Sequence, residues 1–548
     1  MNKHIITFSL ITIFCLSYSF QLFAQKDDEK ENLKLKMAQA WLSYNDEDYN
    51  GALRIYRELF KHYPENTQLN FRMGQCYIET NKMDSALSHL RIAIQDSTIK
   101  NEAYFLSGKA YQYMGDLDKA IEIFYKYKSK LTPKQNERDF VNVLLLQCLT
   151  AKNYISNPVN VKITNLGTNV NTKYVDACPS ITADGKTIIF TSRRPENTGG
   201  KIDPYSEDYY DDIYISTYNE ATKEWTLAKN IGTPVNTDTH DANMSISPDG
   251  STIFIYKNAE NVTKSGDIYY STKKPTGEWD VPRALEGKYV NSTYFESSAC
   301  ITPDGNTIYF VSEREKEGFG HGDIYMVKKE GREWGKPINL GFPINTPYDE
   351  IGVYIHPDGK TLFFSSNGHN IMGGYDIFIS ALGDDGKWSE PINLGYPINT
   401  TRNEIHFVLA TDRKNAFISS NRDGGYGAYD IFNIDMSYYF RTNKNIPASI
   451  ANSVSGPPLS ILKGKVSDAE TNKPLKANII IKDIADDKTN ITESDENGEY
   501  FITLPADKKY EIIVKAKEYK TLDFKFKLPK GDSNTFTLIK HLLLNKDY

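Results

Sequence analysis

Cysteine is scarce in this sequence, and the cysteines that are present form no pattern typical of a metal site or a disulfide framework. Only five occur in 548 residues, and one of them, Cys15, lies in an apolar N-terminal segment. No two have the Cys-x-x-Cys spacing of zinc or redox sites. We therefore expect the other four to be small buried apolar side chains: Cys76, Cys148, Cys178 and Cys300.

The sequence also lacks clustered positive charge and catalytic motifs. The net charge is −7, and no long basic run or stripe is present. Nucleic-acid binding is therefore not expected, because it depends on Lys and Arg neutralising phosphates. The sequence has no Gly-x-Ser-x-Gly elbow, no Walker loop and no dinucleotide fingerprint. We expect a protein that is not an enzyme and that needs no cofactor.

One apolar run stands at the N-terminus. Lys3 and His4 precede an apolar stretch over residues 5–16, and residues 22–24 end on Ala24. This order is typical of a secretory signal peptide, so we expect residues 1–24 to be removed after Ala24. No other stretch is apolar enough to cross a bilayer. The expected location is the periplasm or the outer-membrane surface, with no transmembrane segment left after processing.

Residues 31–156 are expected to form helices that repeat every 34 residues. Small residues recur at two positions and a large apolar residue at a third, which lets paired helices approach closely. The segment NEAYFLSGKAYQYMGDLDKAIEIFYKYKSKLTP resembles the tetratricopeptide repeat. The resemblance implies a concave surface that binds peptides or partner proteins, with a plain spacer as the alternative. The recurring positions are Ala40, Gly74, Gly108; Ala52, Ala86, Ala120; and Tyr56, Leu90, Phe124.

Residues 159–437 change to short alternating strands. Hairpins such as ITADGKTIIFTS and ITPDGNTIYFVS occur five times, and each precedes a strand that begins with Asp-Ile. A period of 53–56 residues that holds four strands predicts one propeller blade per copy. The strand-opening residues are Asp212, Asp267, Asp323, Asp376 and Asp430. Outer-strand tryptophans follow the first four copies: Trp225, Trp279, Trp334 and Trp388.

The ends of this region predict how it closes. The fifth copy lacks an outer strand, whereas VKITNLGTNVNT before the first copy matches the outer strands PINLGFPINT and PINLGYPINT. We expect this early segment to complete the last blade, which leaves no free edge. The repeats resemble the TolB-like, WD-related propeller family. The expected fold class is thus multidomain: an all-α helical repeat solenoid, a five-bladed all-β propeller and a small all-β sandwich.

The sandwich is expected over residues 461–528. Alternating strands around an Asn-Gly turn resemble the carboxypeptidase regulatory-like domain, which implies a spacer or adhesion module without chemistry of its own. Residues 438–460 contain Pro, Gly and Ser and are interpreted as a linker, and residues 529–548 as a C-terminal tail.

This order of domains resembles exported envelope proteins of Bacteroidetes-type bacteria, in the OmpA family and associated with type IX secretion. The resemblance implies partners among cell-envelope proteins. The sequence ends where an OmpA-like domain would begin, so peptidoglycan binding is not expected. We therefore expect a protein-binding scaffold. A propeller that senses a ligand or cation is the alternative, and a glycan-active enzyme is a third, since paired acids can hydrolyse glycans.

One repeated set of acids is a candidate metal site. In every copy an acid lies eight residues before the hairpin aspartate and follows an Asn-Thr or Asn-Ser pair. If these acids ring one mouth of the channel, they could bind Ca²⁺ or a basic side chain, because clustered like charges need compensation. The preferred interpretation is structural, with each acid accepting local hydrogen bonds. The acids are Asp176, Asp241, Glu296, Glu350 and Glu404.

A longer loop in the first copy is a candidate partner-binding site. It precedes Asp212 and carries Tyr205, Tyr209 and Tyr210. Aromatic loops that break a repeat often serve recognition. The alternative is a solvated acidic loop.

Overall fold

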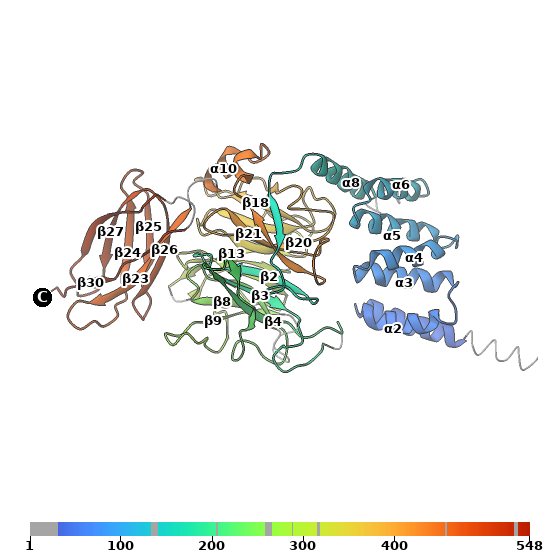
Figure 1. Ribbon diagram of the computed structural model, residues 1–548, viewed down its shortest axis with the longest axis horizontal. Helices are drawn as coiled ribbons and strands as arrows, with labels where there is room; N and C mark the ends of the chain where they lie inside the picture. Colours follow the sequence, from blue (N-terminus) through green and yellow to red (C-terminus); the bar gives the residue numbers. More distant parts are fainter. Residues whose placement is uncertain are drawn as a thin grey trace, which may run out of the picture. The chain divides into compact units, whose positions relative to one another are not determined.

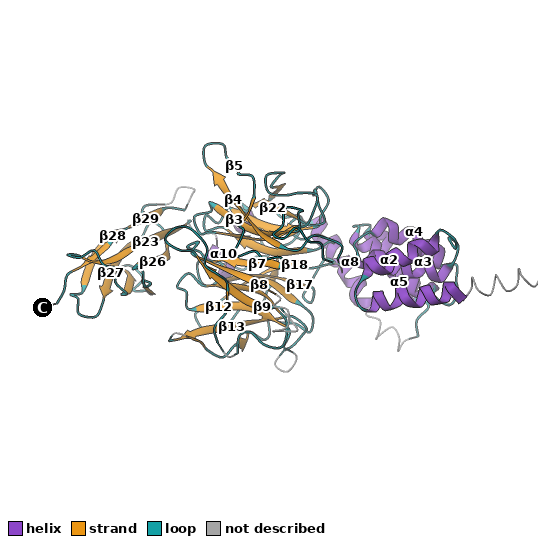
Figure 2. Ribbon diagram, turned by 90° about the horizontal axis from the view of Figure 1, so that it is seen from below, coloured by secondary structure: helices purple, strands orange, loops and turns teal. Residues whose placement is uncertain are grey.

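The protein is described here from a computed structural model, in which helical repeats are followed by a large all-β region (Figures 1 and 2). The chain divides into two compact units, a helical unit that ends at Cys148 and a β unit that makes up most of the remainder. The predicted signal peptide, residues 1–24, lies outside the described residues. Those comprise 31–132, 141–203, 206–257, 266–287, 289–314, 318–331, 333–454, 458–530 and 535–547.

The helical unit consists of antiparallel helix pairs. Side chains of Asp48, Asn66 and Asp116 accept backbone N–H groups at three helix starts, which satisfies donors that have no partner inside the helix. Within the described ranges, no helix combines the length and the apolar character needed to span a bilayer. Residues 31–45 are helical. They are followed by α2 (Tyr49–Phe60), α3 (Thr67–Glu79), α4 (Met83–Ala93), α5 (Lys100–Tyr113), α6 (Leu117–Lys128) and α8 (Val141–Ser156).

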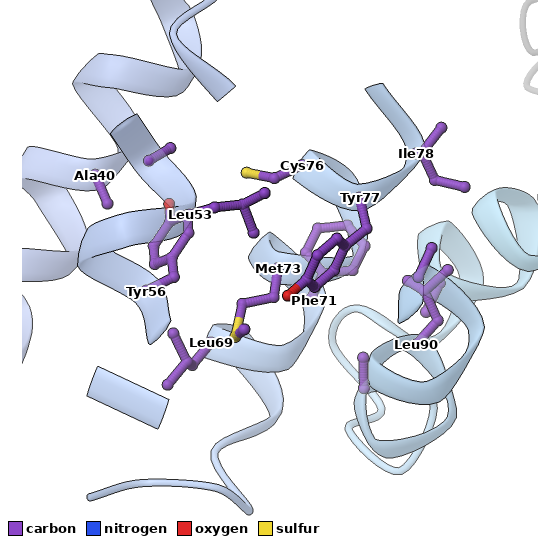
Figure 3. Packing of buried hydrophobic residues seen from close by; sticks show 14 of the residues in the cluster. Ala40, Leu53, Tyr56, Leu69, Phe71, Met73, Cys76, Tyr77, Ile78 and Leu90 are labelled. Atoms are coloured by element: carbon purple, nitrogen blue, oxygen red, sulfur yellow. The ribbon is translucent and has the colours of Figure 1, made fainter. Parts of the chain in front are cut away.

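Small residues at the repeated positions allow the helices of each pair to touch. A Cβ atom built on Gly74 would lie 2.7 Å from Leu90 Cδ2, and one built on Gly108 would overlap the Phe124 ring. Figure 3 shows the resulting core, in which Tyr56 of α2 and Leu69 of α3 are both buried. The predicted helical repeats are therefore confirmed, and their period follows from this small-against-large packing.

Five antiparallel sheets follow within the described residues, four of them built from one sequence copy each. The first has β2 (Asp176–Ile181), β3 (Thr187–Ser192), β4 (Asp212–Asn219), β5 (Glu224–Trp225) and β6 (Lys229–Asn230). The second has β7 (Asp241–Ile246), β8 (Thr252–Lys257), β9 (Asp267–Thr272) and β10 (Arg283–Ala284). The third has β11 (Glu296–Ile301), β12 (Thr307–Ser312), β13 (Asp323–Glu330), β14 (Glu333–Trp334) and β15 (Ile338–Asn339). The fourth has β16 (Glu350–Ile355), β17 (Thr361–Ser366), β18 (Asp376–Ala381) and β19 (Ile392–Asn393).

The fifth sheet is completed by a segment from ahead of the first. It contains β20 (Glu404–Leu409), β21 (Asn415–Ser420) and β22 (Asp430–Asp435), and β1 (Lys162–Asn165) pairs antiparallel with β22. This pairing confirms the prediction made from VKITNLGTNVNT. The inner strands contact one another in the order β2, β7, β11, β16 and β20, and β20 also contacts β2.

Each sheet packs its apolar residues against its neighbours. Phe364 and Phe378 of the fourth sheet share a core with Cys300 and Tyr309 of the third. The tryptophans of the outer edges belong to these cores, as Trp225 and Trp279 illustrate. These two tryptophans are therefore packing residues.

The Asp-Gly turns between the first two strands of each sheet require a left-handed residue. Four turns place glycine there, at φ values of +70°, +77°, +69° and +71° for Gly185, Gly250, Gly305 and Gly359. The fifth turn, TDRK, places Arg413 there at φ +59°. Glycine tolerates this conformation without the steric cost that other residues incur.

The small sandwich is larger than the sequence predicts. It consists of two four-stranded sheets, and one of them contains β29 and β30, which run parallel to β23. The predicted tail, residues 529–548, is therefore partly sheet, because Leu542 and Leu544 bury against the sandwich core. The strands are β23 (Leu459–Asp468), β24 (Asn478–Asp483), β25 (Thr489–Glu493), β26 (Glu499–Pro505), β27 (Lys509–Lys515), β28 (Leu522–Lys527), β29 (Thr537–Ile539) and β30 (Leu542–Leu544).

The predicted linker, residues 438–460, is also largely ordered. It forms α9 (Tyr439–Thr442) and α10 (Ala448–Val454), and α10 contacts β17 and β18. Tyr439, Ile450 and Val454 are buried in one core with residues of the fourth and fifth sheets. The interpretation as a plain linker is corrected, because apolar side chains in this segment bury against the β region.

Candidate functional site

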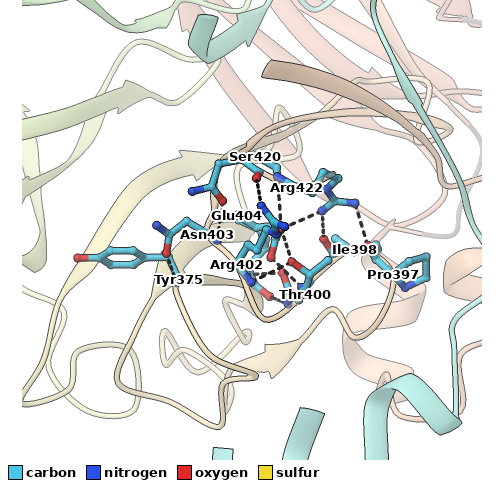
Figure 4. Close-up of polar contacts among 12 residues, drawn as sticks. Tyr375, Pro397, Ile398, Thr400, Arg402, Asn403, Glu404, Ser420 and Arg422 are labelled. Carbon is cyan, nitrogen blue, oxygen red and sulfur yellow. Dashed lines mark hydrogen bonds and ion pairs between the residues drawn. The ribbon is translucent and has the colours of Figure 1, made fainter. Parts of the chain in front are cut away.

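The five predicted acids open the inner strands of the five sheets, and all are fully buried. Each accepts the backbone N–H and the hydroxyl of the Thr or Ser four residues earlier. In the fifth sheet, Thr400 donates its N–H to Glu404 Oε2 at 2.7 Å and its hydroxyl to Oε1 at 2.8 Å (Figure 4). The acid therefore fixes the chain just before its own strand.

Four of these acids also form an ion pair within their sheet. In the fifth, Arg422 Nη2 lies 3.2 Å from Glu404 Oε1, and the guanidinium donates to the carbonyls of Pro397 and Ile398 (Figure 4). The same group lies over the Phe432 ring. Burying a carboxylate is tolerated here because a cation and hydrogen bonds replace its hydration. The other pairs are Arg194–Asp176 at 2.5 Å, Lys257–Asp241 at 2.5 Å and Arg314–Glu296 at 3.3 Å.

The fourth sheet departs from this pattern at Glu350. Gly368 occupies the position of Arg422, and a Cβ there would overlap Thr346 Oγ1. The next residue, His369, lies 2.9 Å from Ile344 O through Nε2 and packs on Phe378. Burial lowers the pKa of His369. A neutral imidazole thus replaces the guanidinium, and Glu350 is left with hydroxyl and amide donors only.

Burial therefore dominates the ionisation of Glu350. It raises the pKa of this carboxyl to about 8, and hydrogen bonds from Thr346 and Ser366 offset only part of the effect. Ser366 donates to Oε1 at 2.7 Å. Glu350 is the acid whose environment differs most from that of its four equivalents.

The structure does not bring the five acids together as a metal site. Across the ranges described, no three His, Cys, Asp or Glu side chains are grouped so that they could hold a metal ion. The asparagines that precede the acids act between sheets instead. Asn236, which precedes β7, accepts from Ile213 N and donates to Ile213 O, both at 3.0 Å. Asn171, Asn291, Asn345 and Asn399 bind the preceding sheet in the same way.

The centre between the inner strands is narrow. A cavity of about 20 Å³ lies there, lined in part by Pro179, Met244, Cys300, Tyr354 and His406. Such a volume accommodates about one water molecule. Burial lowers the pKa of His406 to about 4, so this imidazole is neutral at physiological pH. A small-molecule substrate therefore has no room at this point.

The residue immediately before each inner acid differs from sheet to sheet: Val175, His240, Phe295, Asp349 and Asn403. The acid and the Asn-Thr or Asn-Ser pair before it recur in all five sheets, so the fold does not fix the residue that precedes the acid. We call the polar residues at and beside these positions the polar mouth. They are Arg193, Asp211 and His240 in its first part, and Asp349, Asn367, Tyr375, Asn403 and Tyr429 in its second. In its first part, Asp211 Oδ1 lies 2.8 Å from Arg193 Nε, and Oδ2 lies 2.7 Å from His240 Nδ1. Burial opposes ionisation of Asp211, but these two partners outweigh it and lower its pKa.

In the second part of the polar mouth, the described residues form no such ion pair around Asp349. Asp349 accepts from Asn367 Nδ2 at 3.2 Å and from the Tyr375 hydroxyl at 3.3 Å. Tyr375 N donates to Asn403, whose Nδ2 donates to the Tyr429 hydroxyl at 3.0 Å. A chain of hydrogen bonds thus links the fourth and fifth sheets.

The predicted tyrosine loop lies against the polar mouth. The Tyr210 and His240 rings pack edge-on with 4.6 Å between their centroids, and the Tyr209 and Tyr174 rings do so at 5.8 Å. Tyr205 lies outside the described residues. Reasoning on the sequence missed the polar mouth, although its signal is present: charged and aromatic residues that vary beside an acid found in every copy.

Comparisons with known proteins identify two of the three domain types. Residues 43–97 and 102–130 match tetratricopeptide repeat families. Residues 462–545 match the CarboxypepD_reg-like domain, which includes the strands that were predicted as a tail. The chain therefore contains tetratricopeptide repeats and a carboxypeptidase regulatory-like domain.

Individual relatives are partial or distant. The BBSome complex member BBS4 of Bos taurus is 32% identical over 89 residues, which is 16% of this chain and 17% of that protein. TolB from Acinetobacter baumannii is 16% identical, with a TM-score of 0.29, over 48% of this chain and 54% of TolB. A GH43 β-xylosidase/α-arabinofuranosidase from a compost metagenome is 11% identical, with a TM-score of 0.32, over 50% of this chain and 94% of the enzyme. Structural likeness of this strength defines neither fold nor activity.

Proposed function

We propose that this chain is a non-enzymatic, protein-binding scaffold of the bacterial cell envelope, exported through its N-terminal segment to the periplasm or the outer-membrane surface and linked to secretion machinery. We further propose that its five sheets form a five-bladed, TolB-like propeller. The succession of contacts among the inner strands and the pairing of β1 with β22 support this architecture.

The observation that carries protein binding is the tetratricopeptide repeat unit. Stacked helix pairs form a curved surface that generally serves recognition of other proteins. The pairs α3–α4 and α5–α6 are matched by repeat families and pack through Gly74 and Gly108. The partial relative BBS4 is a member of a protein complex, which agrees with this role.

The chemistry of the acids supports a role other than catalysis. Glycoside hydrolysis needs two accessible carboxyl groups, one of which is held protonated. Glu350 has a raised pKa, but its side chain is fully buried, and its four equivalents are buried in ion pairs. None of the five acids can therefore reach a polysaccharide chain.

Photo-crosslinking in the native envelope tests the scaffold proposal. A photoreactive residue at Gln68 on α3 or Lys109 on α5, both exposed, should capture one or a few envelope proteins, identified by mass spectrometry. The same residue at the exposed Lys525 of the sandwich is the matched control. Failure to capture any protein from the helical positions would contradict the proposal.

A further inference from the structure

An exposed aromatic group lies where the third and fourth sheets meet. Phe319, Phe342 and Tyr348 are 56%, 77% and 41% exposed. Phe319 is in the loop before β13, Phe342 in the segment between the third and fourth sheets, and Tyr348 just before β16. Three large aromatic side chains in water are unfavourable for an isolated protein, whereas such groups supply much of the energy in protein interfaces.

Backbone contacts hold these three residues side by side. The Phe319 ring lies 3.7 Å from the position of a Cβ atom on Gly341, which is next to Phe342. Gly320 packs so closely on the Tyr348 backbone that a side chain there would overlap it. The loop is fixed by Asp323, whose carboxylate accepts N–H from Phe319 and Gly320. The aromatic group is therefore built into the fold.

Two carboxylates border the aromatic group. Asp349 follows Tyr348 directly, and its donors among the described residues are neutral: Asn367, Tyr375 and Gly322 N. The Glu313 side chain remains accessible, and its partial desolvation together with the charge of Asp349 raises its pKa, against an opposing contribution from His321. Neither carboxylate forms an ion pair with a described residue. We define Phe319, Phe342, Tyr348, Glu313 and Asp349 as the corner patch.

The equivalent corner between the fourth and fifth sheets has a different character. Its residues are Met372, Tyr396, Arg402, Asn403 and Asn367. The methionine is buried, the tyrosine is half-buried and no acid is present. Because the two corners share one backbone design, neither the aromatic exposure nor the negative charge of the corner patch is needed for folding.

From this juxtaposition we propose that the corner patch docks a segment of a partner protein that carries an apolar or aromatic side chain next to a basic one. The apolar side chain packs among Phe319, Phe342 and Tyr348. The basic side chain lies against Asp349 and Glu313, at the place where the first part of the polar mouth has Arg193. The inference rests on the proposed scaffold function and names the chemistry of one of its partners.

Selection from a random peptide library displayed on phage tests the inference with the full chain as bait. Enriched peptides should combine basic with apolar residues. A synthetic copy of the best one should bind the variants Phe342→Ser and Asp349→Lys at least about tenfold more weakly, a loss of about 1.4 kcal/mol. Tyr426→Ser is the matched control, because Tyr426 occupies the place of Phe319 in the fifth sheet and is 53% exposed.

The possible results are decisive for the corner patch. Binding that is weakened by both patch substitutions, unchanged by Tyr426→Ser and abolished when the basic residues of the peptide become Glu supports it. No enrichment, enrichment of acidic peptides, or equal binding to Phe342→Ser overturns it. Self-association of the full chain that Phe342→Ser abolishes also overturns it, since the occupant is then a second copy. Crosslinking from the helices tests the scaffold function separately. The scaffold proposal and the corner-patch proposal can therefore fail independently.

Discussion

The fourth and fifth sheets share a backbone design and differ in how they bury a carboxylate. Glu404 has the guanidinium of Arg422, whereas Glu350 has Gly368 and a neutral His369 at the corresponding places. Both acids hold the chain before their strands through a threonine, Thr400 or Thr346. The difference teaches that the repeated function of the acid is local hydrogen bonding, and that the cation is an exchangeable means of compensating its burial.

The largest effect should come from removing the cation of the fifth sheet. Arg422→Met leaves Glu404 buried without its cation, with only Thr400 and Ser420 still donating to it. Removing one member of a buried ion pair costs about 3–5 kcal/mol. His369→Met in the fourth sheet removes one neutral hydrogen bond, which is worth about 1 kcal/mol. Urea unfolding followed by tryptophan fluorescence measures both, because Trp225, Trp279, Trp334 and Trp388 lie in the β region. Equal losses in the two variants would show that the sheets do not differ as described.

A second contrast concerns pH. The folded-state pKa of Glu350 is about 8, well above the value of about 4.5 for an exposed glutamate. The folded state therefore binds a proton that the unfolded state releases, and its stability falls as pH rises from about 4.5 to about 8. The slope is at most about 1.4 kcal/mol per pH unit. Glu350→Gln should reduce the slope by the contribution of this group, as measured by urea unfolding at several pH values in that window. Buried Asp212, with a pKa raised to about 6, contributes to the slope in both proteins.

Glu404→Gln is the control for the pH experiment. It leaves Arg422 buried without its carboxylate, so it should lower the stability throughout the same window. Glu350→Gln should instead match or exceed the wild type at the alkaline end. If the wild-type stability is flat across the window, the buried carboxyl of the fourth sheet does not titrate as inferred.

The sequence predicted the features that depend on repetition. The 34-residue spacing of Gly74 and Gly108 implies close helix pairs, and the structure shows each glycine against a large side chain. The orphan segment before the first copy predicted the pairing of β1 with β22. Both inferences succeed because the same physical requirement recurs several times in the chain. Recurrence distinguishes a structural pattern from a chance one.

Features that occur once could not be predicted in the same way. Pro, Gly and Ser indicated a linker after residue 437, yet Tyr439 and Ile450 bury in the core because apolar surface outweighs local turn preference. The raised pKa of Glu350 depends on the absence of an arginine at the position that Gly368 occupies. It depends also on burial, which only the folded structure reveals. The corner patch joins residues that lie up to 36 positions apart, from Glu313 to Asp349.

The smallest expected effect concerns the turns that precede the second strands of the fourth and fifth sheets, β17 and β21. Gly359 has φ +71° and open space around its Cβ position, so Gly359→Ala should cost about 1–2 kcal/mol through backbone strain alone. Arg413 already occupies that conformation in the fifth sheet at φ +59°, so Arg413→Gly should relieve a similar strain and forfeit the packing of the arginine side chain. Urea unfolding of the two variants should therefore show a clear loss for the fourth sheet and a change near zero for the fifth. A loss as large in Arg413→Gly would mean that the arginine side chain, through its packing, stabilises the fifth turn more than its backbone conformation costs.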